Sequence, residues 1–408
     1  MTDGLEENLH AALRRAAERA PRAPGALSSR VAARSRRRRA RAQALVAAAA
    51  VAVVAGGTGL AVRGAGGGSA PPVLSPSPAA SAETAPGTPS PAALPEPVEK
   101  VWPQAVWKIP ARLPGVGKIH PEAIIDDRTL LLTTEESFEK ASAIHAYDLD
   151  TGQTRKIADI RTPKGVFASG FRVGEGRIVW QTVDEGSGGR EGTKTVEFWS
   201  VPVGGGEPEA VTTDRPLKGR SDQLAVAGGK LAFSLWEGGV FTVPLGGGTV
   251  EPVPGADRHH ILSWPWVGTP GDHTSNGEPS FGELLNAETG ETSRAVVRPG
   301  ERGLRCGVTT CTGGRGDGTR FRRSRDGSQE RDLPPGASAE SALDRFYIVN
   351  MPRPSDGEYL YDQVTGRSGD LGLRGVSLRA GTTEDRMVTY PFGKKHMVID
   401  LERIAEGS

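Results

Sequence analysis

The two cysteines of the chain, Cys306 and Cys311, are separated by four residues that include Gly307 and two threonines. Such a segment allows a bend or hairpin that brings the two sulfur atoms together. A zinc site is less well supported, because the spacing is not the usual two residues and no second cysteine pair follows. In an oxidising compartment the spacing therefore predicts a Cys306–Cys311 disulfide, whose short loop stiffens the chain locally more than it stabilises the whole fold.

The seven histidines are scattered along the chain, and only one group of them lies near an acid in a way that suggests a metal. His259 and His260 are adjacent, so on a strand their side chains point to opposite faces. Asp272 and His273 follow in the next long loop, and together these side chains could approach a metal ion. Isolated surface or strand histidines are the simpler interpretation, and we predict no metal and no cofactor.

No part of the sequence matches a catalytic motif. The G-x-S-x-G motif of a serine hydrolase and the Walker loop of a nucleotide-binding site are both missing. Asp148 and Asp150 lack the rest of a calcium-binding loop and fit a turn better. The adhesion triplet Arg315–Asp317 arises easily by chance in a glycine-rich turn. We therefore predict no catalytic residue, and we expect that the chain is not an enzyme.

Charge is distributed unevenly along the 408 residues, whose net charge is +1. Residues 1–63 contain 12 arginines and four acids, a balance of +8, so the remaining residues carry −7. A surface that binds nucleic acid normally has a basic surplus. Nucleic-acid binding by the long C-terminal part is therefore disfavoured.

A basic segment and an apolar run make up the N-terminal part. Residues 2–20 have the pattern of a short amphipathic helix capped by Asp3, and residues 36–41 contain five arginines. Residues 42–62 are 21 positions without a charge, about 31 Å of helix. The arginines predict that residues 1–41 stay in the cytoplasm and that 42–62 form an uncleaved signal-anchor in the cell membrane. Cleavage near the small residues that follow is the alternative.

The rest of the chain consists of a linker and a repetitive β-rich domain. Residues 63–99 are rich in proline, alanine and serine, which predicts a disordered tether outside the membrane. In residues 100–408, short β-rich runs pair across glycine turns six times. The glycines of these six turns are Gly152, Gly205, Gly247, Gly290, Gly327 and Gly366. Successive turn glycines are 53, 42, 43, 37 and 39 residues apart.

A period of about 40 residues is typical of a β-propeller with four-stranded antiparallel blades. The length of residues 100–408 predicts an all-β fold of about seven blades. Residues 104–110 read as a strand without a hairpin partner, and we expect this strand to close the ring as the outermost strand of the blade that ends near Leu401. A β-sandwich, or two of them, is the alternative fold.

The order of these parts resembles that of a known class of proteins. A capped helix over Asp3–Arg19, an arginine block, an Ala/Val span, a proline-rich tether and turns such as Tyr147–Gly152 are similar to single-pass actinobacterial membrane proteins with a TolB-like/WD40-like propeller. The resemblance implies a binding or scaffold role, and it implies no catalytic residue.

Three hypotheses of function follow. In the first, a propeller anchored through residues 42–62 binds a protein, a peptide or a cell-envelope component on one face of the ring. In the second, the chain is a signal relay in which residues 2–20 engage a cytoplasmic regulator such as a sigma factor. In the third, a propeller enzyme of lactonase or lyase type has its site in the central channel. The third hypothesis requires acids or histidines that converge on the ring axis.

Overall fold

The computed structural model describes residues 94–137, 140–184, 195–351, 356–374, 378 and 386–407. The chain divides into two compact units, Met1–Ala85 and Pro86–Ser408, and the described residues all belong to the second. The predicted helix at residues 2–20, the apolar run at 42–62 and the linker up to residue 93 lie outside the described residues. Within the described ranges, no helix has the length and the apolar character needed to cross a membrane.

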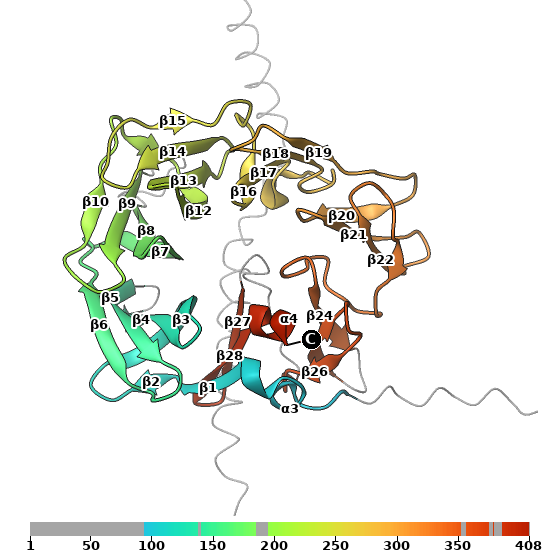
Figure 1. Cartoon of the computed structure of the whole chain (residues 1–408), viewed down its shortest axis with the longest axis horizontal. Helices are drawn as coiled ribbons and strands as arrows, with labels where there is room; N and C mark the ends of the chain where they lie inside the picture. Colours follow the sequence, from blue (N-terminus) through green and yellow to red (C-terminus); the bar gives the residue numbers. More distant parts are fainter. Residues whose placement is uncertain are drawn as a thin grey trace, which may run out of the picture. The chain divides into compact units, whose positions relative to one another are not determined.

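Seven antiparallel sheets surround a central axis in the second unit (Figure 1). This arrangement confirms the predicted seven-bladed propeller and excludes the β-sandwich. The sheets are here called blades 1 to 7 in chain order. Blades 3, 4 and 5 have four strands, blades 1 and 2 have an additional two-residue strand, and blades 6 and 7 have three strands within the described residues.

The strands of each blade follow one another along the chain, apart from β1, which belongs to blade 7. Blade 1 contains β2 (Arg112–Leu113), β3 (Gly117–Asp126), β4 (Thr129–Ser137), β5 (Lys140–Asp148) and β6 (Thr154–Asp159). Blade 2 contains β7 (Val166–Gly174), β8 (Arg177–Asp184), β9 (Thr195–Pro202), β10 (Glu209–Val211) and β11 (Leu217–Lys218). Blade 3 contains β12 (Ser221–Ala227), β13 (Lys230–Leu235), β14 (Val240–Pro244) and β15 (Glu251–Pro252).

The second half of the ring repeats this order. Blade 4 contains β16 (His260–Ser263), β17 (Trp266–Thr269), β18 (Glu283–Asn286) and β19 (Thr292–Arg294). Blade 5 contains β20 (Arg302–Cys306), β21 (Thr310–Gly314), β22 (Arg320–Ser324) and β23 (Arg331–Asp332). Blade 6 contains β24 (Phe346–Met351), β25 (Gly357–Asp362) and β26 (Ser368–Asp370). Blade 7 contains β27 (Met387–Phe392), β28 (Lys395–Asp400) and β1 (Val106–Pro110).

All six predicted hairpins are present as neighbouring antiparallel strands, from β5–β6 in blade 1 to β25–β26 in blade 6. Each blade packs between two others, so both faces of its middle strands are buried. In β4 the consecutive residues Leu130, Leu131 and Leu132 are all fully buried. Side chains alternate between the two faces of a strand. Leu131 therefore packs with blade 2, and its two neighbours pack with blade 7.

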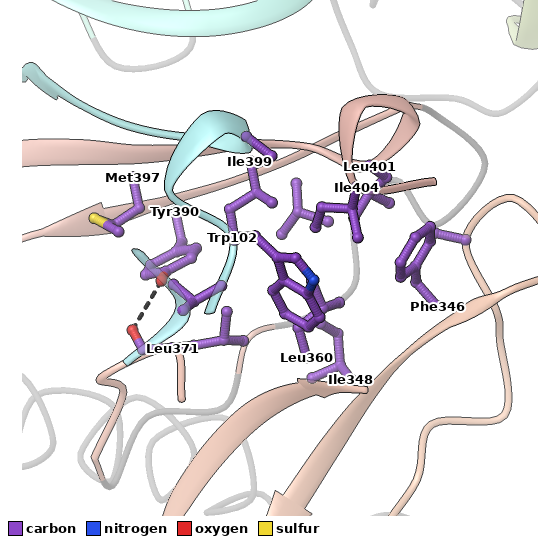
Figure 2. Close-up of a cluster of buried hydrophobic side chains, with 14 of the residues drawn as sticks. Trp102, Phe346, Ile348, Leu360, Leu371, Tyr390, Met397, Ile399, Leu401 and Ile404 are labelled. Atoms are coloured by element: carbon purple, nitrogen blue, oxygen red, sulfur yellow. Dashed lines mark hydrogen bonds between the residues drawn. The ribbon is translucent and has the colours of Figure 1, made fainter. Parts of the chain in front are cut away.

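The ring closes as the sequence predicts. Strand β1 pairs antiparallel with β28, with Val106 opposite Ile399 and Pro110 opposite Lys395. The short helices α3 (Val98–Val101) and η1 (Pro103–Ala105) precede this strand and carry Trp102 between them. Trp102 lies in an apolar cluster with side chains of blades 6 and 7 and of the C-terminal helix α4 (Leu401–Glu406), as Figure 2 shows. The first and last elements of the propeller thus share one core.

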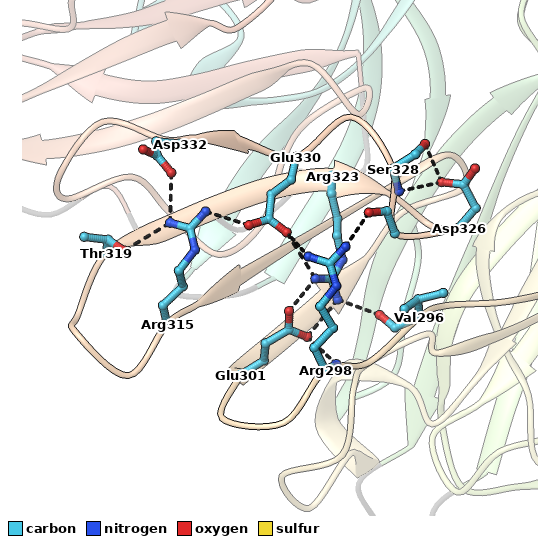
Figure 3. A network of polar contacts seen from close by, with 11 residues as sticks. Val296, Arg298, Glu301, Arg315, Thr319, Arg323, Asp326, Ser328, Glu330 and Asp332 are labelled. Carbon is cyan, nitrogen blue, oxygen red and sulfur yellow. Dashed lines mark hydrogen bonds and ion pairs between the residues drawn. The ribbon is translucent and has the colours of Figure 1, made fainter.

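Blade 5 is held together differently from the other blades. Its apolar cluster contains a single aromatic residue, Phe321, together with the two cysteines. Cys306 and Cys311 lie opposite each other on β20 and β21 and form a disulfide with an S–S distance of 2.03 Å, which confirms the predicted pair. Beside them, the guanidinium of Arg323 is completely buried and pairs with Glu301 and Glu330 (Figure 3). Ion pairs and a disulfide replace part of the apolar core in this blade.

Candidate functional site

The innermost strands of blades 1 to 5 share an irregularity that the sequence alone did not indicate. Each of these strands has at least one residue more than its partner strand, which is a β-bulge. A bulge re-aims a side chain and is common next to functional sites. The bulged positions near the middle of these strands are Glu122, Gly170–Phe171, Asp222, Leu262 and Gly303–Leu304. Two of these positions, in blades 1 and 3, carry a carboxylate.

Glu122 lines two adjoining cavities. The first, of about 350 Å³, lies between blades 1 and 2 and is also lined by Lys118, His120 and Glu135. The second, of about 480 Å³, is lined by residues of β3, β7, β12 and β27, with Arg386 beside β27. We call this second space the central cavity, because its walls are the inner strands of four blades. Both cavities share Glu122 and the bulge of blade 2.

The central cavity has charged groups of both signs in its wall. Glu122 and Asp222 supply carboxylates, and Arg172 and Arg386 supply guanidinium groups. Arg172 Nη2 donates a hydrogen bond to the side-chain oxygen of Gln223 over 2.9 Å. Arg386 Nε donates to Asp400, the N-cap of α4, over 2.9 Å. These contacts fix the positions of the two guanidinium groups. Because the wall carries fixed groups of both charges, the cavity is suited to bind a ligand with several polar groups of its own.

Burial raises the pKa of the Glu122 carboxyl above its ordinary value of 4.5. The hydrogen bond that Thr133 Oγ1 donates to Glu122 Oε1 over 2.6 Å, and the charges of His120 and Arg172, offset this effect only in part. A carboxyl with a raised pKa in a cavity is a candidate hydrogen-bond donor or acid.

Replacement of Glu122 by Gln is expected to increase stability near neutral pH. The folded-state pKa of Glu122 lies above the unfolded value, so folding stability falls as the pH rises through the range above 4.5. Glu122→Gln removes this fall, so the variant should be more stable than the unchanged protein at pH 7. Thermal unfolding of the full-length protein between about pH 4 and 8 measures the difference.

Glu135→Gln is the matched control for this experiment, because the pKa of Glu135 is shifted the other way. Hydrogen bonds from His120 and Lys118 lower it. The stability that Glu135 contributes is present above its ordinary pKa and is lost as the pH falls. Glu135→Gln should therefore lose stability near neutral pH. If Glu122→Gln and Glu135→Gln changed the stability at neutral pH in the same direction, the interpretation of Glu122 as a buried and only partly compensated charge would be wrong.

The structure brings together only part of the histidine group that is the alternative to isolated histidines. The structure brings His260 of β16 together with His273 of the short helix η2 (Asp272–Thr274), but their acidic partner is Asp222 of β12. Asp272 instead pairs with Arg305 over 2.8 Å. His259 lies outside the group, and burial lowers its pKa. Asp222 was missed because it precedes His260 by 38 residues and belongs to another blade.

No protein-family model and no curated relative matches the sequence. Among solved structures, the chain is similar to the WD40 propeller domain of Doa1, with 9% identity, a TM-score of 0.39, and coverage of 73% of this chain and 98% of that domain. It is also similar to an acylaminoacyl peptidase of Pyrococcus horikoshii, with 12% identity, a TM-score of 0.42, and coverage of 67% of this chain and 47% of the peptidase.

A third similar structure is an oligogalacturonate lyase of Vibrio parahaemolyticus, with 11% identity, a TM-score of 0.32, and coverage of 68% of this chain and 76% of the lyase. The chain spans less than half of the peptidase. At these identities the likeness concerns the fold alone. Our expectation that the chain is not an enzyme rested on the absence of known catalytic motifs, and it is contradicted, because the similar structures include a peptidase and a lyase. We correct it: a propeller of this kind does not exclude enzymatic activity.

Proposed function

We propose that the chain is a membrane-anchored propeller that binds a segment of a partner protein in its central cavity. The observation that carries this proposal is the convergence of bulged inner strands on one cavity with charges of both signs. A polypeptide offers matching charges, amides and apolar side chains at close spacing. Apolar groups of Phe171 and Met387 line the same cavity and suit the apolar part of such a ligand.

The anchoring part of the proposal rests on the sequence. The arginine-rich residues 1–41 and the apolar residues 42–62 support an N-terminus in the cytoplasm and a propeller on the outer side of the membrane. The proline-rich residues 63–99 support a tether that lets the propeller reach a partner away from the lipid. The relay hypothesis, in which residues 2–20 engage a cytoplasmic regulator, stays a prediction from the same N-terminal part.

Site-specific photocrosslinking in intact cells tests the proposed function. A photoreactive phenylalanine analogue replaces Thr389, which lines the central cavity from β27, and in a second strain it replaces Val364, whose side chain is 66% exposed in the turn after β25. We expect a defined polypeptide adduct from position 389 and none of the same mass from position 364. An adduct with a glycan, or equal adducts from both positions, would contradict a protein ligand in the cavity.

Substitution of Arg172 by Ala should lower the yield of this adduct about tenfold, because a charged hydrogen bond contributes roughly 1.5–3 kcal/mol. Arg294→Ala is the matched control, since Arg294 forms an exposed ion pair with Glu283 on β18 and β19, away from the cavity lining. An unchanged yield with Arg172→Ala would show that the cavity wall does not hold the partner.

A further inference from the structure

We propose that Asp222, His260 and His273 form a binding site for a divalent transition-metal ion, with Zn²⁺ as the best match. One potential ligand atom of each residue lies within 4.8 Å of the corresponding atoms of the other two. Asp222 Oδ2 is 2.6 Å from His260 Nδ1 and 4.0 Å from His273 Nε2. The three residues come from β12, β16 and η2, so the fold and not a local motif brings them together.

The ligand types and their number match a known kind of metal site. Imidazole nitrogens with one carboxylate suit zinc and related first-row ions, and three protein ligands leave one position open. At metal–ligand distances of about 2.0–2.2 Å, the ligand atoms of a tetrahedral site lie roughly 3.3–3.6 Å apart. The two distances from Asp222, 2.6 and 4.0 Å, lie on either side of this value, and the three ligand atoms all lie within 4.8 Å of one another. A bound ion would draw the three side chains to the tetrahedral spacing.

The surroundings of Asp222 and His260 hold their side chains in place without a metal. Ser234 Oγ donates a hydrogen bond to the second oxygen of the Asp222 carboxylate, and it accepts one from the amide of Ile261 over 3.1 Å. The ring of His260 packs against Gly271 so closely that a Cβ atom added at Gly271 would be 2.5 Å from the ring. Partners of this kind orient the ligands of metal sites.

His273 is positioned by a different set of contacts. Its ring stacks on the indole of Trp236 with 3.8 Å between the centroids. Without a metal, its Nε2 donates a hydrogen bond to the Trp236 carbonyl oxygen over 2.7 Å, so an ion bound at this nitrogen would replace that hydrogen bond. The guanidinium of Arg220 lies 3.7 Å from the centre of the same indole ring. His273 is the exposed member of the group and His260 is buried, so the site has one side open to solvent.

The hydrogen bond between Asp222 and His260 does not involve His273, whose contacts with Trp236 place its Nε2 4.0 Å from the same carboxylate. The two imidazole rings meet edge to face, with 4.7 Å between their centroids, and the aspartate lies next to both. Two imidazoles beside one carboxylate are a ligand set that can hold a metal ion. Asp222 also lines the central cavity, so a bound ion would lie at the cavity wall. This inference stands on its own contacts and does not require the proposed protein ligand.

Metal titration of the full-length protein tests the site. The protein is purified in a mild detergent, treated with a chelator, and titrated with Zn²⁺ in a calorimeter and with Co²⁺ by visible absorption. We expect one ion per chain and Co²⁺ ligand-field bands typical of nitrogen and oxygen ligands. His273→Ala and Asp222→Asn should each weaken binding by more than about 100-fold, since even outer-shell partners are worth roughly 10–100-fold.

His120→Ala is the matched control, because His120 also pairs with a carboxylate, Glu135 over 2.8 Å, but has no place in the three-residue group. This variant should bind the metal as the unchanged protein does. His260 is buried, so its replacement could impair folding, and the exposed His273 decides the question. The proposal is overturned if the unchanged protein binds no Co²⁺, or if His273→Ala and His120→Ala bind it equally well.

Discussion

Replacing Arg323 with methionine is expected to lower the free energy of unfolding by about 3–5 kcal/mol, as for other buried ion pairs that lose one partner. The side chain of Arg323 is 0% exposed, and its Nη2 donates to Glu301 Oε2 over 2.7 Å and to the carbonyl oxygen of Val296 over 2.6 Å. Burial raises the pKa of Glu301, but Arg323 and the Arg298 amide lower it by more, so the net shift is downward. Without Arg323, Glu301 is left as a largely buried charge that has lost its main partner. Urea unfolding at pH 7 measures the difference.

The control for this experiment is an exposed ion pair in the neighbouring blade. Arg294, 78% exposed, pairs with Glu283, and Arg294→Met should cost less than about 1 kcal/mol. A double variant, Arg323→Met with Glu301→Leu, should recover part of the loss, because it removes the orphaned charge as well. Equal costs for Arg323→Met and Arg294→Met would show that the network of Figure 3 contributes no more than a surface pair.

The hairpin and the disulfide of blade 5 could be predicted from the sequence, but the buried arginine network could not. Strand β22 has the sequence Arg320–Ser324 with three arginines, a pattern of an exposed strand. In the structure Arg323 is buried because acids from the loop before β20 and from the turn before β23 surround it. Arg325 is also buried, and burial lowers its pKa to about 10 while it donates hydrogen bonds to backbone carbonyls of blades 4 and 5. Partners this distant in sequence have no local signal.

The hairpins could be predicted because their signals are local, and the ring closure because residues 104–110 read as a strand without a hairpin partner. Each hairpin turn needs a residue with positive φ, and glycines such as Gly152 and Gly290 mark these turns in the sequence. The inner strands lack such a signal. Their bulges interrupt the two-residue alternation of apolar and polar side chains along a strand, as at Glu122 in β3. The side chains of β3 are also mostly half-buried. The residues of the candidate site lie on these strands, so the sequence predicted the scaffold better than the site.

Replacement of Trp102 by Ala is expected to cost about 3–5 kcal/mol, the range for buried tryptophan and phenylalanine side chains. Trp102 is 1% exposed and lies between the first described segment of the propeller and blades 6 and 7 (Figure 2). A Cβ atom added at Gly369 of β26 would be only 2.8 Å from its ring, which shows how closely the indole approaches that strand. Thermal and urea unfolding of the full-length protein, followed by tryptophan fluorescence, measure the loss.

Trp107→Ala separates the effect of Trp102 from the general loss of an aromatic side chain. Trp107 lies five residues after Trp102, on the closing strand β1, and is only partly buried, so its replacement should cost less than about half as much. The closing strand itself makes the same backbone pairs with β28 in both variants. Equal costs for the two substitutions would contradict a special contribution of the core that Trp102 shares with blades 6 and 7. A larger loss for Trp102→Ala would show that this core stabilises the closed ring more than the contacts of Trp107 do.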